Sequence, residues 1–142
     1  MKFDKLDKKI TKTLKQIGLP FLRYSLSFIF IWFGLGKLIG NSLANELVKN
    51  TIYWIPSNIF LPILGVWEVL IGLCFLHKRL LRIGIFLLMP QIIGTFLPFL
   101  VLPNTTLTTT FPYLSLEGQY ILKNLIILGA ALVIGSHVRD KI

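Results

Sequence analysis

Four long apolar runs occupy most of this 142-residue chain and dictate the kind of structure it can form. They cover residues 17–39, 59–76, 80–102 and 119–138 to within a few residues. An α-helix needs about 20 residues to cross the hydrocarbon core of a bilayer, so each run can form one span. The sequence therefore predicts four transmembrane helices.

The composition agrees with lipid as the main solvent of the chain. Hydrophobic residues make up 54% and charged residues only 15%, whereas soluble domains carry about 25% charged residues. A chain this apolar cannot cover its own surface against water. We expect a single membrane domain over residues 1–142, without a separate soluble domain.

The basic residues predict how the helices are oriented. Six lysines fall in the first fifteen residues, the 77–82 turn contains three basic residues and the C-terminus two more, while loop 40–58 has one lysine and loop 103–118 has no lysine or arginine. Positive charge concentrates on the cytoplasmic side, which places both termini inside. We predict an all-α, antiparallel four-helix bundle, and we assign the net charge of +9 to contact with lipid headgroups rather than nucleic acid.

Residues 1–16 are expected to form an amphipathic helix in the inner membrane interface. Phe3, Leu6, Ile10 and Leu14 recur at spacings of three and four, and lysines fill the rest of the helical circumference. A basic flanking tail that only sets the orientation is an equally good interpretation of the same residues.

Polar residues inside the apolar runs are the strongest indication of a site. Insertion scales assign a charged group at a helix centre a cost of about 2.5–3.5 kcal/mol, so such groups normally face protein or a wet cavity. The residues concerned are Arg23, Lys37, Glu68, Gln91, Lys123 and Asn124.

Two of these spans carry their polar residues on a single face. Spacings of three and four align Arg23, Ser27, Phe30, Gly34 and Lys37, which predicts that this stripe faces the bundle.

In the second span, Gly65, Glu68 and Gly72 align in the same way, with the glycines allowing a close helix contact. Counting the rise per residue from Ile17 and Leu76 places Arg23 and Glu68 at similar depths. This predicts a buried Arg23–Glu68 ion pair, which either lines a site or only sets the helix register.

Three further polar contacts are expected. Lys37 is expected to extend to the outer headgroups, and Glu117 to pair with either Lys37 or Lys123. Gln91 follows Pro90, so its amide is expected to bond a backbone group that the proline leaves free. A metal site is not expected, because Cys74 is the only cysteine and His77 and His137 have no converging ligands.

Three stretches of the chain resemble the DoxX-like superfamily of small four-span membrane proteins, and most closely its YkgB-type, reactive-chlorine-resistance branch. The stretches are LRYSLSFIFIWFGLGKL, LGVWEVLIGL and FPYLSLEGQYILKNLIILGAALVIGS. Positions similar to the family pattern are Arg23, Trp32, Gly34, Lys37, Glu68, Gly72, Phe111, Pro112, Leu114, Ser115, Gly118 and Lys123. Asn124 departs from the acidic residue often found there, and loop 40–58 is shorter than in the chlorine-resistance proteins. The resemblance implies a bundle in the bacterial inner membrane.

Our leading functional hypothesis is a membrane subunit or accessory factor in redox-stress defence, rather than a stand-alone enzyme. We expect a pocket for a quinone or a lipid headgroup at Arg23, Glu68 and Lys123, with Trp32, Trp54 and Trp67 beside it. The full set of candidate ligand-binding residues is Arg23, Lys37, Glu68, Gln91, Lys123, Asn124, Trp32 and Trp67.

Two other functions fit the same residues. The charged stripe can line a path for protons or a small solute. Alternatively, the chain is an assembly or interaction factor that contacts a protein partner through loops 40–58 and 103–118. A homo-oligomer is compatible with each hypothesis.

Overall fold

The computed structural model describes residues 2–42, 44–107 and 113–139, and helices dominate this part of the chain. The helices are α1 (Lys2–Ile39), α2 (Asn45–Thr51), α3 (Ser57–Leu76), the 3-10 turn η1 (Lys78–Leu80), α4 (Leu81–Thr95), α5 (Leu97–Val101), α6 (Pro103–Thr106), α7 (Leu116–Leu122) and α8 (Asn124–Ser136). A single isolated bridge joins Leu107 and Leu114.

Four helical segments are long and apolar enough to cross a membrane. They are Phe3–Ile39, Ser57–Leu76, Lys78–Val101 and Leu116–Ser136. The third segment combines η1, α4 and α5, and the fourth combines α7 and α8. The described chain is therefore an all-helical, multi-pass membrane protein, as the apolar runs predicted.

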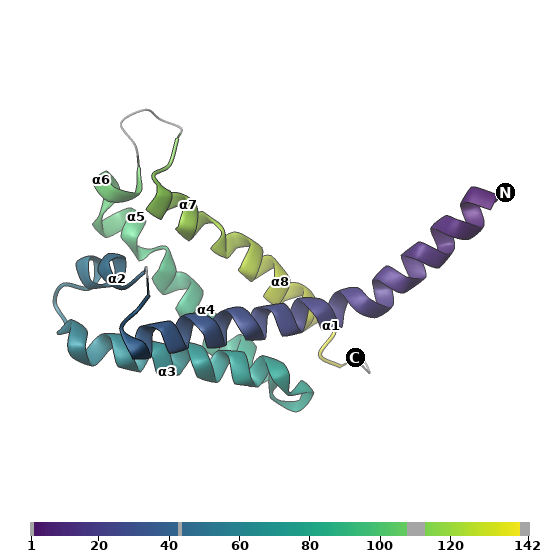
Figure 1. Ribbon diagram of the computed structural model, residues 1–142, viewed down its shortest axis with the longest axis horizontal. Coiled ribbons are helices and arrows are strands. Elements are labelled where there is room, and N and C mark those ends of the chain that lie inside the picture. Colours follow the sequence, from purple (N-terminus) through teal and green to yellow (C-terminus); the bar gives the residue numbers. More distant parts are fainter. Residues whose placement is uncertain (1, 43, 108–112, 140–142) are drawn as a thin grey trace.

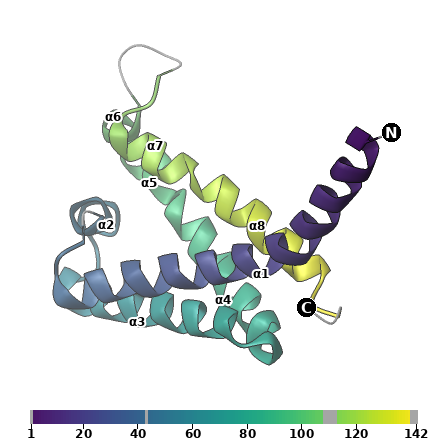
Figure 2. The same cartoon turned by 45° about the vertical axis from the view of Figure 1, so that its right-hand side comes forward.

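The helices form a V rather than a parallel-sided bundle. α1 and α3 lie side by side as one arm, and α4–α5 and α7–α8 form the other (Figures 1 and 2). The arms meet where α8 approaches α1, at the end of the molecule that carries η1, and diverge toward the opposite end (Figure 1). The short helix α2 lies in the opening of the V.

Glycines hold α1 and α3 in close contact. A Cβ atom added at Gly34 would lie 2.6 Å from the carbonyl oxygen of Gly65, and one at Gly72 would lie 2.8 Å from the carbonyl oxygen of Ser27. The Ser27 hydroxyl donates a hydrogen bond of 2.6 Å to the carbonyl oxygen of Gly72. These contacts show that the two helices run in opposite directions, and they fix the register of one against the other.

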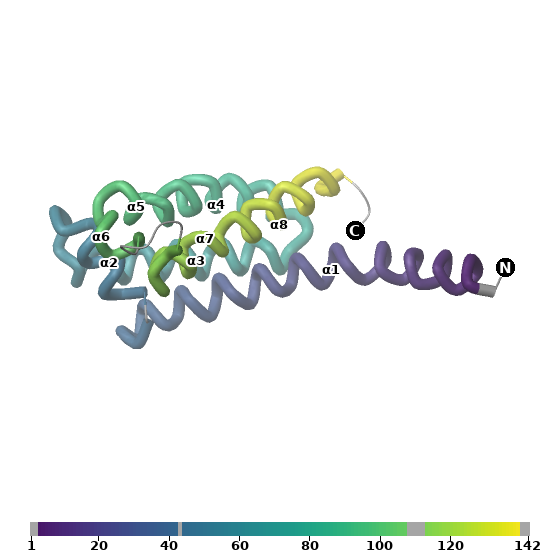
Figure 3. Tube along the Cα trace, turned by 90° about the horizontal axis from the view of Figure 1, so that it is seen from above, coloured from purple at the N-terminus to yellow at the C-terminus, as the bar shows by residue number. Residues whose placement is uncertain are grey.

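α1 extends well beyond its partners. Its 38 residues correspond to about 57 Å of helix, nearly twice the ~30 Å thickness of a hydrocarbon core. The N-terminal part projects from the bundle at a bend (Figures 1 and 3), and Pro20 inside the helix is the kind of residue that causes one.

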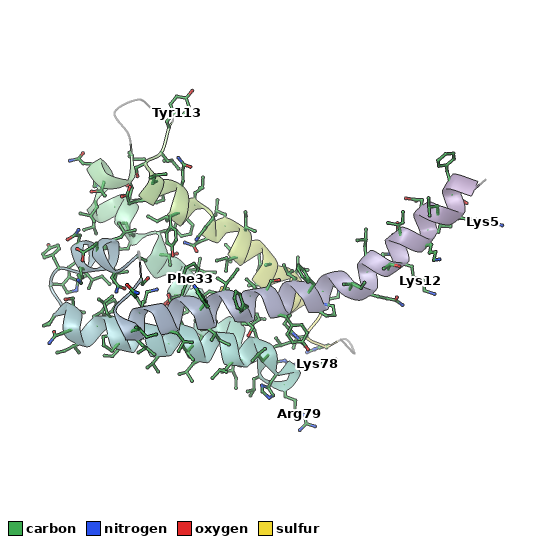
Figure 4. All side chains as sticks on the ribbon, in the orientation of Figure 1. Lys5, Lys12, Phe33, Lys78, Arg79 and Tyr113 are labelled. Atoms are coloured by element: carbon green, nitrogen blue, oxygen red, sulfur yellow. The ribbon has the colours of Figure 1, made fainter. Side chains whose placement is uncertain are left out.

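The apolar stripe of this projecting part is uncovered. Phe3, Leu6, Ile10, Leu14 and Ile17 are all exposed. Lys5 and Lys12 project from one side of the same segment (Figure 4). The segment is thus an amphipathic helix that continues into the first span without interruption.

The closed end of the V is filled by apolar side chains. The buried core consists of Leu26, Phe30, Ile71, Phe75, Leu81, Leu88, Ile92, Ala130, Ala131 and Ile134. Ile71, Phe75, Leu88 and Ile134 have no exposed surface. The open end of the V is therefore where space is left for a site.

Candidate functional site

A pocket of about 240 Å³ lies inside the bundle, between the arms of the V and beneath α2. Its walls come from α1, α2, α3, the α4–α5 segment and the α7–α8 segment. Most of the lining is apolar, and the core residues Phe30 and Ile92 form part of it. The polar side chains on its walls are Lys37, Thr51, Glu68, Gln91, Thr95, Tyr120, Lys123 and Asn124.

One wall of the pocket carries a hydrogen-bonded network centred on Glu68. The Lys37 ammonium donates to Glu68 Oε2 at 2.7 Å, and the Gln91 amide donates to Glu68 Oε1 at 2.8 Å. Lys37 and Glu68 are 5% and 6% exposed, so the ion pair is held away from solvent. Both carboxylate oxygens are engaged, which joins α1, α3 and α4 at this point.

The expected Arg23–Glu68 ion pair does not form. Arg23 lies one turn before Ser27, and Ser27 packs against Gly72, so Arg23 lies near the end of α3. Glu68 is two turns away from that level, or about 12 Å. The predicted depths are counted from Ile17 as the inner end of the first span, but α1 extends from Ile17 further toward the N-terminus. The contacts of the glycines set the register of α1 against α3 instead, and they place Arg23 rather than Ile17 at the level of the end of α3.

Arg23 is buried apart from the pocket. It is 2% exposed, and its Nε and Nη1 atoms have no hydrogen-bond partner in the described part of the chain. Its guanidinium carbon lies 4.6 Å from the centre of the Tyr24 ring. The stripe prediction is correct in that Arg23, Ser27 and Lys37 are all buried, but only Lys37 of these three lines the pocket.

A second cation lines the pocket from the junction of α7 and α8, in an aromatic setting. The Lys123 ammonium lies 3.7 Å from the centre of the Tyr120 ring and 5.0 Å from that of Phe33. Phe33 and Tyr120 also pack edge to face at 6.2 Å. Phe33 borders the opening of the V from α1 (Figure 4).

The expected ion pairs with Glu117 are not observed in the described part of the chain. Glu117 is exposed, whereas Lys37 is buried against Glu68 and does not extend to the membrane surface. Lys123 contacts aromatic rings and, among the described residues, has no carboxylate within ion-pair distance.

Other predicted residues divide between the pocket and its surroundings. Gln91 and Asn124 line it, and the Gln91 amide bonds Glu68 rather than a backbone group freed by Pro90. Trp32 is 66% exposed and stacks on Phe28, so it faces away from the bundle.

The remaining tryptophans do not line the pocket either. The Trp67 indole donates to the carbonyl oxygen of Leu87 at 3.1 Å and braces α3 against α4. Trp54 follows α2 and is 56% exposed. The aromatic surface of the pocket comes from other side chains.

Two parts of the pocket were missed from the sequence. Tyr120 precedes Lys123 by three residues, a spacing that places both on one helical face and could have indicated it. The contribution of α2 is not evident from the sequence, because the aromatic residues of loop 40–58 are typical of the membrane surface. Ala44, Leu47, Val48, Thr51 and Ile52 instead cover the pocket.

These features define a class: a multi-pass, all-helical membrane protein with a partly polar pocket between its helices. No family model, curated protein or solved structure matches the chain. The expected resemblance to the DoxX-like superfamily therefore stays a prediction from the sequence motifs, of which Phe111 and Pro112 lie outside the described residues. In the described ranges, no three His, Cys, Asp or Glu side chains gather as a metal site would require.

Proposed function

We propose that this protein binds the polar head of a membrane amphiphile, a quinone or a lipid, in the pocket between its helices. The observation that carries the proposal is the Lys37–Glu68–Gln91 network on the wall of a pocket of about 240 Å³. The resemblance to DoxX-like proteins suggests the biological role, which is that of a membrane subunit or accessory factor in redox-stress defence. In this proposal the chain binds for a partner enzyme and does not act alone.

The chemistry of the pocket walls favours an amphiphilic ligand. An ion pair inside a membrane protein costs free energy to desolvate, and its hydrogen bonds offset that cost only when the geometry is good. The network presents a fixed arrangement of polar groups to the pocket, while Phe30, Phe60 and Leu64 provide apolar surface. Few precisely placed polar groups in an apolar pocket are typical of small-molecule sites.

The proposed location is the bacterial inner membrane, with both termini in the cytoplasm. Lys78 and Arg79 project from the closed end of the V (Figure 4), the end where α1 continues into its lysine-rich segment. Basic side chains at one end of a bundle favour the cytoplasmic leaflet. The pocket and α2 would then face the outer half of the bilayer.

The proposal is tested with a variant that removes the network without leaving a lone charge. Lys37→Met with Glu68→Gln deletes both charges together, because either change alone would strand a buried ion. We expect the double variant to keep its helicity by circular dichroism and to bind a soluble ubiquinone analogue at least about tenfold more weakly in nanodiscs. A tenfold loss corresponds to about 1.4 kcal/mol.

The chain offers a matched control in the exposed Lys49–Glu46 pair of α2, at 3.0 Å. Lys49→Met with Glu46→Gln makes the same chemical change outside the pocket and should leave binding unchanged. The pocket proposal would be removed if the wild-type protein and both double variants bound the quinone with equal affinity, and if the same held for lipids offered in its place.

The transport alternative is less well supported. A conducting path must cross the closed end of the V, where the buried polar residues Arg23 and Ser27 lie among completely buried apolar side chains, including Ile71, Phe75, Leu88 and Ile134. Proton or anion flux through purified protein in liposomes decides the matter, and flux above that of protein-free liposomes would favour transport.

An interaction role is favoured by the exposed aromatic pair after α2. Tyr53 and Trp54 are 76% and 56% exposed and pack edge to face at 5.2 Å. Loop 103–118, the other expected contact surface, lies in part outside the described residues. Crosslinking from position 54 in native membranes should recover a stoichiometric partner if this role is correct, and recovery of lipid alone would count against it.

A further inference from the structure

We infer that the ligand of the pocket carries an acidic head, the carboxylate of a single-chain amphiphile, and that Lys123 is the residue that binds it. The inference rests on the proposed binding function and goes beyond it, because it selects one chemical class of ligand and one wall of the pocket. The two lysines on the pocket walls differ in that Lys37 pairs with Glu68, whereas Lys123 has no ion pair within the described residues.

The charges on the described pocket wall do not balance. Lys37 and Glu68 neutralise each other at 2.7 Å, and the second oxygen of Glu68 accepts from Gln91. Lys123 lies beyond ion-pair distance of Glu68 and of every other described carboxylate, which leaves one positive charge uncompensated on the described pocket wall. Electrostatic attraction is strong where the dielectric constant is low, so this wall favours an anion.

The hydrogen-bond donors on that wall also have no acceptor among the residues that the structure describes. Contact with the faces of Tyr120 and Phe33 stabilises the Lys123 cation but does not occupy its three N–H groups. The Asn124 amide and the Tyr120 hydroxyl form no side-chain hydrogen bond within the described chain. An ammonium, an amide and a hydroxyl together suit a head with two acceptor oxygens, as in a carboxylate.

A neutral quinone fits this wall less well. Its carbonyl oxygen can accept one hydrogen bond from Lys123, but it leaves the positive charge uncompensated in a largely apolar site. A carboxylate accepts from several donors and also neutralises the positive charge of Lys123, which a quinone carbonyl does not do.

The shape of the pocket indicates one chain rather than two. A volume of about 240 Å³ holds a head and the first part of a chain. Phe33, Tyr120 and Lys123 are only partly buried, so the pocket opens where α1 faces α7. The rest of the chain would leave through this opening into the bilayer.

The test uses the full-length protein in nanodiscs of neutral phosphatidylcholine. Binding of radiolabelled palmitate is measured alone and in competition with methyl palmitate, which has the same chain without the charge, and with ubiquinone-1. We expect palmitate to bind saturably and methyl palmitate to compete at least about tenfold more weakly. This comparison uses wild-type protein and so does not depend on the folding of any variant.

Variants then locate the contact. Lys123→Gln should weaken palmitate binding about tenfold or more, and Lys123→Arg should retain most of it because the charge is kept. Lys49→Gln, which removes a partly exposed lysine outside the pocket, should leave palmitate binding unchanged.

Five results would overturn the inference that Lys123 binds a carboxylate head. Equal affinity for palmitate and its methyl ester would do so at once, as would full palmitate binding by Lys123→Gln. Saturable binding of ubiquinone-1 without saturable binding of palmitate would exclude an acidic head while leaving the proposed function standing. If phosphatidylglycerol displaced palmitate at a concentration below that of the palmitate, the preferred head group would be a lipid phosphate and not a carboxylate. Failure of all these compounds to bind would overturn the inference and the proposed function together.

Discussion

Lys37 and Lys123 line the same pocket, but their ammonium groups have different surroundings. Lys37 is buried and bonded to Glu68, whereas Lys123 is partly buried and rests on the rings of Tyr120 and Phe33. Buried ion pairs hold elements in place when both partners are present and destabilise strongly when one is lost. At the residue scale, Lys37 thus acts on the pocket as part of the network with Glu68, whereas Lys123 keeps its N–H donors available to a ligand.

This difference predicts the outcome of two double-mutant cycles. Lys37→Met alone should lower the free energy of unfolding by about 3–5 kcal/mol, because Glu68 would keep its charge without a cation. Adding Glu68→Gln should recover most of that loss. The measurement is reversible unfolding in mixed micelles.

The second cycle combines Arg23→Met with Glu68→Gln. The two side chains are about two helical turns apart, so their effects should add to within about 0.5 kcal/mol. A large coupling energy between Arg23 and Glu68 would contradict the observed register of α1 and α3.

At the scale of elements, the α1–α3 contact depends on glycines. Gly34, Gly65 and Gly72 each lie where an added Cβ would meet the backbone of the other helix. The N-terminal part of α1 has no such partner, and its apolar stripe is available to lipid.

Gly34→Ala is therefore expected to destabilise the protein by about 1–3 kcal/mol, because the added methyl group overpacks the seam. Gly94→Ala is the matched control, since a Cβ there meets nothing within 4 Å. Thermal unfolding should show a lowered midpoint only for Gly34→Ala, and equal midpoints would mean that the helices are not so close.

At the scale of the whole molecule, two arms diverge from an apolar closed end, and α2 covers the space between them. This shape gives the protein a pocket at one end only. The side of the membrane that the pocket faces then depends on the orientation of the chain.

The orientation predicts opposite labelling at two exposed positions. With Cys74 replaced by alanine, a cysteine at Asn50 should react with an impermeant maleimide on intact cells. A cysteine at Lys78 should react only after the membrane is opened. The reverse pattern would place the termini outside.

The apolar runs alone were sufficient to predict four spanning helices. The length of an apolar run can be read from consecutive residues and compared directly with the thickness of a bilayer, without knowledge of tertiary contacts. Helical periodicity likewise predicted that the stripe from Arg23 to Lys37 would be buried. Among the six polar residues singled out, Lys37, Glu68, Gln91, Lys123 and Asn124 line the pocket. The cost of a polar group in lipid was enough to identify them.

Only the tertiary structure decided which cation pairs with Glu68 and which residues cover the pocket. The pairing follows from helix register, and register is set by the contacts of Gly34, Gly65 and Gly72 across two helices. No periodicity within one helix encodes such contacts. The position of α2 likewise depends on the opening of the V, which arises from how four helices pack and not from the composition of the loop itself.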